Sequence, residues 1–159
     1  IIFLENEILY GHSSEVPVAD EWTVPIGSAN VVRAGNDVTL VAFSIMVGKA
    51  IEAAEKLAED GISAEVIDLR TLRPLDASTI VRSVKKTNRL VTCEEGFPQS
   101  GVGAEICARI TELAFDWLDA PVTRVTGADA PLPYAANLEA LALPKASDIA
   151  EAAKSVCYR

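Results

Sequence analysis

From Asp37 onward, short apolar segments alternate with longer segments of helical periodicity, and this alternation constrains the fold more than any other feature. Strands are expected at 38–45, 64–72, 89–94 and 122–126, and helices at 47–60, 77–87, 102–118 and 147–157. The first strand segment is a short run rich in β-branched and apolar residues, which is typical of a strand covered on both faces. This order favours parallel strands joined by right-handed helical crossovers. The sequence therefore predicts an α/β domain of three layers, with a mostly parallel sheet between helices.

Local signals mark the ends of two of these helices. Gly61 follows the helix expected at 47–60, as glycine often does at a helix C-terminus. Pro74 ends the preceding strand segment. Asp76 can accept a hydrogen bond from a free backbone N–H at the start of the helix expected at 77–87.

Residues 1–33 do not share the alternating pattern. Ile1–Leu4 opens an apolar run that we expect to be a single strand, and His12–Pro25 contains the serine, proline and acidic residues of a connector. We therefore assign residues 1–33 to the end of a preceding domain and its connector, and residues 34–159 to the α/β domain. Because the chain starts inside an apolar run without a methionine, we expect it to be part of a longer polypeptide.

The charge balance restricts the classes of partner. The chain has 14 basic and 23 acidic residues, a net charge of −9, which argues against a surface that follows nucleic-acid phosphates. It suits attraction to a basic protein. No apolar run approaches the roughly 20 residues of a membrane span.

Residue types that carry catalysis or bind metals are sparse and scattered. The three cysteines, Cys93, Cys107 and Cys157, lack the paired spacing of zinc sites, so we expect buried free thiols and a reducing compartment. His12 is the only histidine, and in a connector it is expected to be exposed or at an interface. The sequence therefore contains no self-sufficient catalytic set.

The glycine-rich segment Gly96–Gly103 lies between a strand and a helix, where backbone N–H groups can hold an anion. It does not fit the dinucleotide fingerprint, because the third glycine position is Ile106. A structural loop is the preferred interpretation, followed by a contact surface to another domain or subunit. Binding of a small anion remains the alternative.

Several stretches together resemble the β subunits of thiamine-diphosphate-dependent 2-oxoacid dehydrogenases. They are Ile2–Gly11, Val66–Asp76, Lys86–Val91, Glu94–Arg109, Leu118–Val122, Arg124–Asp129 and Pro131–Leu138. The last of them favours the members that act on pyruvate. The terminus Ser155–Arg159 is similar to α-proteobacterial members.

The resemblance implies an α2β2 enzyme that decarboxylates pyruvate and reductively acetylates lipoyl groups, in the bacterial cytoplasm or the mitochondrial matrix. Thiamine diphosphate and Mg²⁺ would lie between the α subunit and the N-terminal domain of β. The residues that contact them would precede this chain, so no catalytic, cofactor-binding or metal-binding residue is assigned here, and the chain alone is expected to be inactive. A transketolase, or an acetoin or branched-chain dehydrogenase, remains an alternative.

The region present here resembles the transketolase-type C-terminal domain, which in the family builds the β–β contact and docks the basic subunit-binding domain of dihydrolipoyl acetyltransferase. The resemblance implies a docking role for Asp119 and for the chain end at Arg159. Glu112 and Asp116 lie one helical turn apart and are expected to share a helix face with Asp119. The alternative for Asp119 is a turn residue that bonds its own backbone before Pro121.

Overall fold

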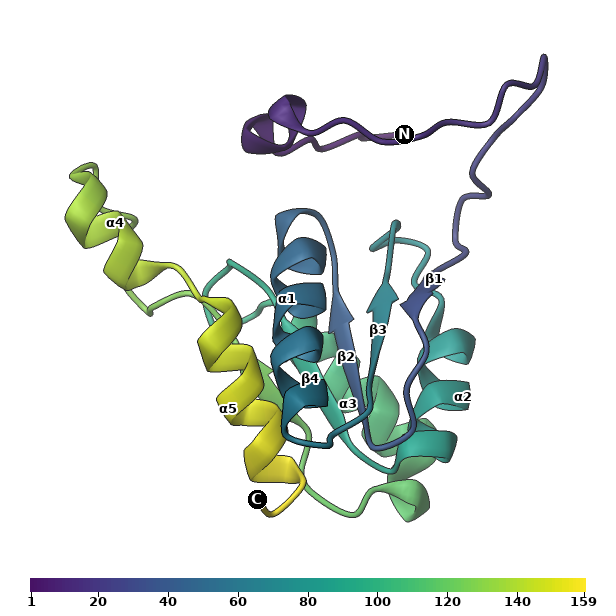
Figure 1. Cartoon of the computed structure of the whole chain (residues 1–159), viewed down its shortest axis with the longest axis vertical. Coiled ribbons are helices and arrows are strands. Elements are labelled where there is room, and N and C mark those ends of the chain that lie inside the picture. The colour runs from purple at the N-terminus through teal and green to yellow at the C-terminus, as the bar shows by residue number, and fades with distance from the viewer.

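A five-stranded sheet in the order β1-β3-β2-β4-β5 forms the centre of the computed structural model, which describes residues 1–159 (Figure 1). The strands are β1 (Asn30–Arg33), β2 (Val38–Ala42), β3 (Ala64–Asp68), β4 (Leu90–Cys93) and β5 (Thr123–Val125). Strands β2 to β5 run parallel, and β1 pairs antiparallel with β3 at one edge. The predicted α/β fold with a mostly parallel sheet is confirmed.

Helices cover both faces of the sheet. On one face lie α1 (Ile45–Glu59) and α5 (Ala146–Val156), and on the other lie α2 (Ala77–Thr87) and α3 (Val102–Ala114). Three short elements complete the chain: the 3-10 helices η1 (Glu7–Gly11) and η2 (Phe115–Trp117), and α4 (Ala136–Ala142). None of these helices is long and apolar enough to cross a membrane.

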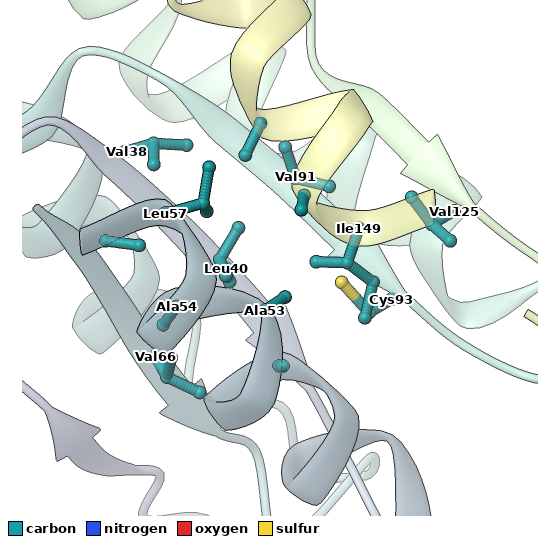
Figure 2. Close-up of a cluster of buried hydrophobic side chains, with 14 of the residues drawn as sticks. Val38, Leu40, Ala53, Ala54, Leu57, Val66, Val91, Cys93, Val125 and Ile149 are labelled. Carbon is teal, nitrogen blue, oxygen red and sulfur yellow. The ribbon is translucent and has the colours of Figure 1, made fainter. Parts of the chain in front are cut away.

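Two apolar cores lie on opposite sides of the sheet because successive strand residues point to opposite faces. Leu40 packs with Leu57 of α1 and Ile149 of α5 in the larger core (Figure 2). The next residue, Val41, belongs to the smaller core with Ile80 of α2 and other residues of α2 and α3. All five residues of β2 are buried, as expected of the central strand.

Helix α2 has the predicted bounds, and its local cap explains why. The Asp76 side chain accepts a hydrogen bond from the Thr79 N–H at 3.1 Å, which satisfies a free donor of the first turn. The same carboxylate accepts the Ala29 N–H at 3.0 Å, so the cap also fastens the segment before β1. Asn88 ends the helix in the left-handed conformation, with φ 60°.

The prediction of one helix from 102 to 118 is wrong. Helix α3 ends at Ala114, whose φ of −150° is outside the helical region, and η2 follows. Contacts to another part of the chain hold this break, since the Asn88 side chain donates to the Trp117 carbonyl at 2.8 Å and the Asp119 N–H donates to the Asn88 carbonyl at 2.8 Å. Apolar periodicity in the sequence gives no indication of such long-range contacts.

The strand expected at the N-terminus is not formed. Residues 7–11 form η1, whose first turn is capped by Asn6, and the side chains of Ile1–Leu4 are exposed without strand pairing. A strand needs a neighbour for its N–H and C=O groups, and no segment of the sheet pairs with this one. The short strand β1 and the helix α4 were not predicted. Strand β1 lies in the part assigned to the connector, and the proposed domain boundary between residues 33 and 34 stays a prediction.

Candidate functional site

The glycine-rich loop holds its own carboxylate at the start of α3. Glu94 follows β4 and is 3% exposed, and its two carboxylate oxygens accept the N–H groups of Val102 and Gly103, both at 2.9 Å. A negative charge is favourable at a helix N-terminus. A Cβ on Gly101 would lie 2.5 Å from a Glu94 oxygen, so the glycine allows the close approach. The arrangement favours the structural interpretation, because an external anion would have to displace Glu94.

The neighbouring carboxyl end of β2 carries a strained residue. Ser44 has φ 54° and ψ −137°, values that a non-glycine residue rarely adopts. The Ser44 side chain is exposed and caps no N–H of α1. His12, the only histidine, follows η1 and is also exposed. Nearby, Lys49 Nζ lies 3.4 Å from Glu95 Oε1 and donates to the Pro144 carbonyl at 2.9 Å. These contacts fasten loops together and include no nucleophile paired with a base.

The surface of the chain has two depressions. One, of about 740 Å³, is lined by residues of the loop before α2 and of α3, including Arg73, Glu105 and Arg109. The other, of about 570 Å³, lies between α1 and α4. No group of three or more His, Cys, Asp or Glu side chains could hold a metal ion.

Asp119 and the chain end, both predicted partner-binding positions, lie together. The Asp119 carbonyl accepts a hydrogen bond from the Tyr158 hydroxyl at 2.8 Å, next to the terminal Arg159. The Asp119 carboxylate is 3.2 Å from Arg89 Nη2, and its side chain is 54% exposed. Its partners are therefore Arg89, Asn88 and Tyr158, which are distant in sequence, so a purely local turn does not account for the residue. Arg159 itself donates to the Asp60 carbonyl at 3.5 Å.

Glu112 and Asp116 do not share one continuous helix as expected. Glu112 lies in α3 and Asp116 in η2, on either side of the break at Ala114. Glu112 Oε2 lies 3.5 Å from Arg109 Nη1, and its side chain is 65% exposed. Asp116 is also exposed. The helical spacing on which their grouping with Asp119 rested is therefore interrupted.

The break lies beside two exposed aromatic side chains, Phe115 and Trp117. Phe115 is 66% and Trp117 is 47% exposed, and Leu113 beside them is 47% exposed. Lys85 Nζ of α2 lies 5.4 Å from the centroid of the Trp117 ring, within cation–π distance. No local signal for this arrangement exists in the sequence, because it depends on where Asn88 holds the chain.

The cysteines are free, as expected, but only one is fully buried. Burial raises the pKa of the Cys93 thiol far above its usual range, with the charge of Glu94 adding to the effect. Cys107 and Cys157 are half-buried, and partial burial raises the pKa of each. All three thiols are therefore weak nucleophiles.

Comparison with known proteins identifies relatives of this chain. Over its whole length the chain is 62% identical to the mitochondrial pyruvate dehydrogenase E1 component subunit beta-1 of Arabidopsis thaliana, of which it covers 45%. It is 57% identical to the pyruvate dehydrogenase E1 component subunit beta of Rhizobium meliloti, of which it covers 35%. The chain thus spans less than half the length of these relatives.

Solved structures and family profiles agree with these relatives. A split-gene transketolase, described as an inactive beta4 tetramer, superposes with a TM-score of 0.75 at 31% identity, over 91% of this chain and 47% of that one. The profile of the transketolase C-terminal domain matches residues 27–149. This match takes in all five strands, so the chain belongs to the transketolase C-terminal domain family.

Proposed function

We propose that this chain is the C-terminal part of the β subunit of pyruvate dehydrogenase (acetyl-transferring). The observation that carries the proposal is the 57–62% identity, over the whole chain, to subunits of that name from a bacterium and from a plant mitochondrion. The complete α2β2 enzyme decarboxylates pyruvate and passes the acetyl group to lipoyl groups. Its compartment is the bacterial cytoplasm or the mitochondrial matrix.

The residues of this chain do not fit thiamine diphosphate or its Mg²⁺. The glycine-rich loop that opens α3 directs its N–H groups at Glu94, and no cluster of acidic residues could hold a metal ion. We therefore assign the cofactor to other parts of the enzyme and derive no catalytic step here. Turnover assays of the complete α2β2 enzyme with pyruvate, branched-chain 2-oxoacids and acetoin test the substrate assignment. A preference for either of the latter would contradict it.

The role proposed for this domain is assembly with a second β subunit and docking of the basic subunit-binding domain of dihydrolipoyl acetyltransferase. The surface around Asp119 and the chain end supports docking. The Asp119 carboxylate is half exposed, so a cationic side chain of the partner can compete with Arg89 for it. Such charged contacts raise association rates, and those that become desolvated add affinity.

Calorimetric titration of the chain with that subunit-binding domain, at low and high salt, tests docking. Binding should weaken at high salt, and Asp119→Ala should weaken it further. Glu55→Ala is the matched control, because Glu55 is exposed on α1 and the substitution changes net charge equally. A folded chain that fails to bind at either salt, or an effect of Glu55→Ala equal to that of Asp119→Ala, would contradict docking at this surface.

A further inference from the structure

Basic residues are concentrated in one segment of this acidic chain. Six of the 14 lysine and arginine residues lie between positions 70 and 89, and Asp76 is the only acidic residue there. These six are Arg70, Arg73, Arg82, Lys85, Lys86 and Arg89. The Asp76 carboxylate accepts the N–H groups of Thr79 and Ala29 and forms no ion pair with any of them. The segment is therefore locally positive within a chain of net charge −9.

Unpaired positive charge remains at the start of α2. At the other end of this helix, Lys86 pairs with buried Glu65, and just beyond it Arg89 pairs with Asp119. Arg73, in the loop before α2, is exposed and forms no ion pair. A guanidinium group stays charged at every pH at which the protein is folded, so Arg73 is a cation without an anion in the chain.

Arg73 lines the larger surface depression, of about 740 Å³. The residues around this depression are Leu72, Arg73, Pro74, Leu75, Ala77, Glu105 and Arg109. Arg109 belongs to α3, which packs beside α2 on the same face of the sheet (Figure 1). Its ion pair with Glu112 is long, at 3.5 Å, and partly exposed, so it holds the guanidinium only weakly. Two arginine side chains with donors to spare therefore line one depression.

The lining indicates the chemical class of a ligand. Guanidinium groups match the planar geometry of a carboxylate and can bind both of its oxygens. Glu105 is the third charged residue of the lining and reduces its formal charge to +1, which favours a monoanion over a dianion. Leu72, Leu75 and Ala77 add an apolar surface that can cover a hydrocarbon group. The volume lies within the range of small-molecule sites.

We propose that this depression binds a small organic monocarboxylate with an apolar body, and that Arg73 and Arg109 hold its carboxylate. The lining contains no nucleophile paired with a base, so the site binds a ligand without reacting with it. This binding requires neither the cofactor nor the turnover proposed above, and it is tested on the chain alone.

Amide NMR spectra of the isotope-labelled chain, titrated with isovalerate at constant ionic strength, test this site. The amide signals of Leu72, Leu75 and Glu105 should shift along one saturable curve. Acetate keeps the carboxylate but lacks the branched body, and isoamyl alcohol keeps the body but lacks the carboxylate. Each should need about tenfold more ligand for half-saturation, because each loses one of the two kinds of contact.

Two arginine variants and a matched control locate the binding. Arg73→Gln and Arg109→Gln should each raise the isovalerate concentration at half-saturation about tenfold, the effect of losing a hydrogen bond between charged groups. Arg82→Gln is the control, because Arg82 is exposed on α2, does not line the depression and undergoes the same change of charge. Amide signals far from the substituted residue should keep their positions in all three variants, which shows that the fold is retained.

The outcomes separate a specific site from a general effect of positive charge. Weaker binding in Arg73→Gln and Arg109→Gln, with unchanged binding in Arg82→Gln, would support the site. Equal weakening in all three variants would overturn it in favour of a diffuse field. Acetate that binds as tightly as isovalerate would overturn the proposed class of ligand. The absence of saturable shifts around the depression, up to the solubility limit of isovalerate, would overturn the proposal as a whole.

Discussion

Replacing Glu94 tests the interpretation of the glycine-rich loop most directly. In the native chain its carboxylate accepts two backbone N–H groups at 2.9 Å, and the residue is 3% exposed. Glu94→Ala removes both acceptors and leaves the donors of Val102 and Gly103 with no partner in the fold. Glu94→Gln keeps one carbonyl oxygen but places an amide N–H₂ group near the second donor.

The expected loss follows from these two bonds. A hydrogen bond to a charged group contributes roughly 1.5–3 kcal/mol, so loss of the two bonds in Glu94→Ala should lower the free energy of unfolding by about 3–6 kcal/mol. Glu94→Gln should cost about 2 kcal/mol, since one neutral bond remains. With a urea m-value of about 2 kcal/mol/M, the Ala variant should unfold at a midpoint lower by about 2 M.

Urea unfolding followed by circular dichroism measures these shifts. Glu95→Gln is the matched control, because Glu95 is the next residue and its side chain, 30% exposed, forms only the 3.4 Å pair with Lys49. A partly exposed pair of this kind contributes at most about 1 kcal/mol. A Glu94→Ala protein that loses less than about 1 kcal/mol, or no more than the Glu95→Gln protein, would refute the role given to Glu94.

Three further predictions concern single residues. Gly103→Ala should destabilise the fold by about 2 kcal/mol, since the new Cβ would lie 2.6 Å from Thr92 Oγ1. Gly48→Ala should instead stabilise the fold by about 0.5–1 kcal/mol, because its new Cβ would have nothing within 4 Å and alanine favours the helix. Chemical denaturation measures both changes. Partial burial would raise the pKa of Asp76, but hydrogen bonds from Thr79, Ser78 and the Ala29 N–H outweigh it and hold the pKa well below its usual range. Because the folded pKa is the lower one, this stabilisation is complete above about pH 4 and is lost as pH falls further, so Asp76→Asn should show a shallower loss of stability in acid melts. Cys93 should react with a thiol reagent only as fast as the chain unfolds, while Cys107 and Cys157 react slowly in the native state; mass spectrometry of the labelled sites distinguishes them.

The sequence predicted those parts of the fold that depend on local or periodic signals. Helix α2 has its expected bounds because Asp76 caps it through bonds within the next three residues. Strands β2, β3 and β4 were predicted because they are almost entirely buried, so apolar residues predominate in them. The end of α3 was not predicted, because the break at Ala114 is held by Asn88, which precedes Trp117 by 29 positions. The prediction of an N-terminal strand was wrong because an apolar pattern does not show whether a neighbouring strand is present to pair with it.

The candidate surface was predictable only in part, for a related reason. Resemblance to a family directed attention to Asp119 and Arg159, and the structure brings Asp119 and the chain end together through Tyr158. It did not indicate that Arg89 pairs with Asp119, since the two are separated by 30 positions. The glycines of the loop predicted a tight turn, but not that Glu94 would fill the start of α3.

Salt should affect the two proposed contacts of this domain, assembly with a second β subunit and docking of a basic domain, in opposite directions. Two copies, each with a net charge of −9, repel one another over most orientations. Screening shortens the range of that repulsion from about 14 Å at 0.05 M to about 4 Å at 0.5 M salt, so the dimer should become tighter. Docking of a basic domain near Asp119 depends on attraction, so the same change should weaken it. Sedimentation and calorimetry of the same preparation at both salts measure the two signs, and contacts that both weaken with salt would show that self-association also depends on complementary charge.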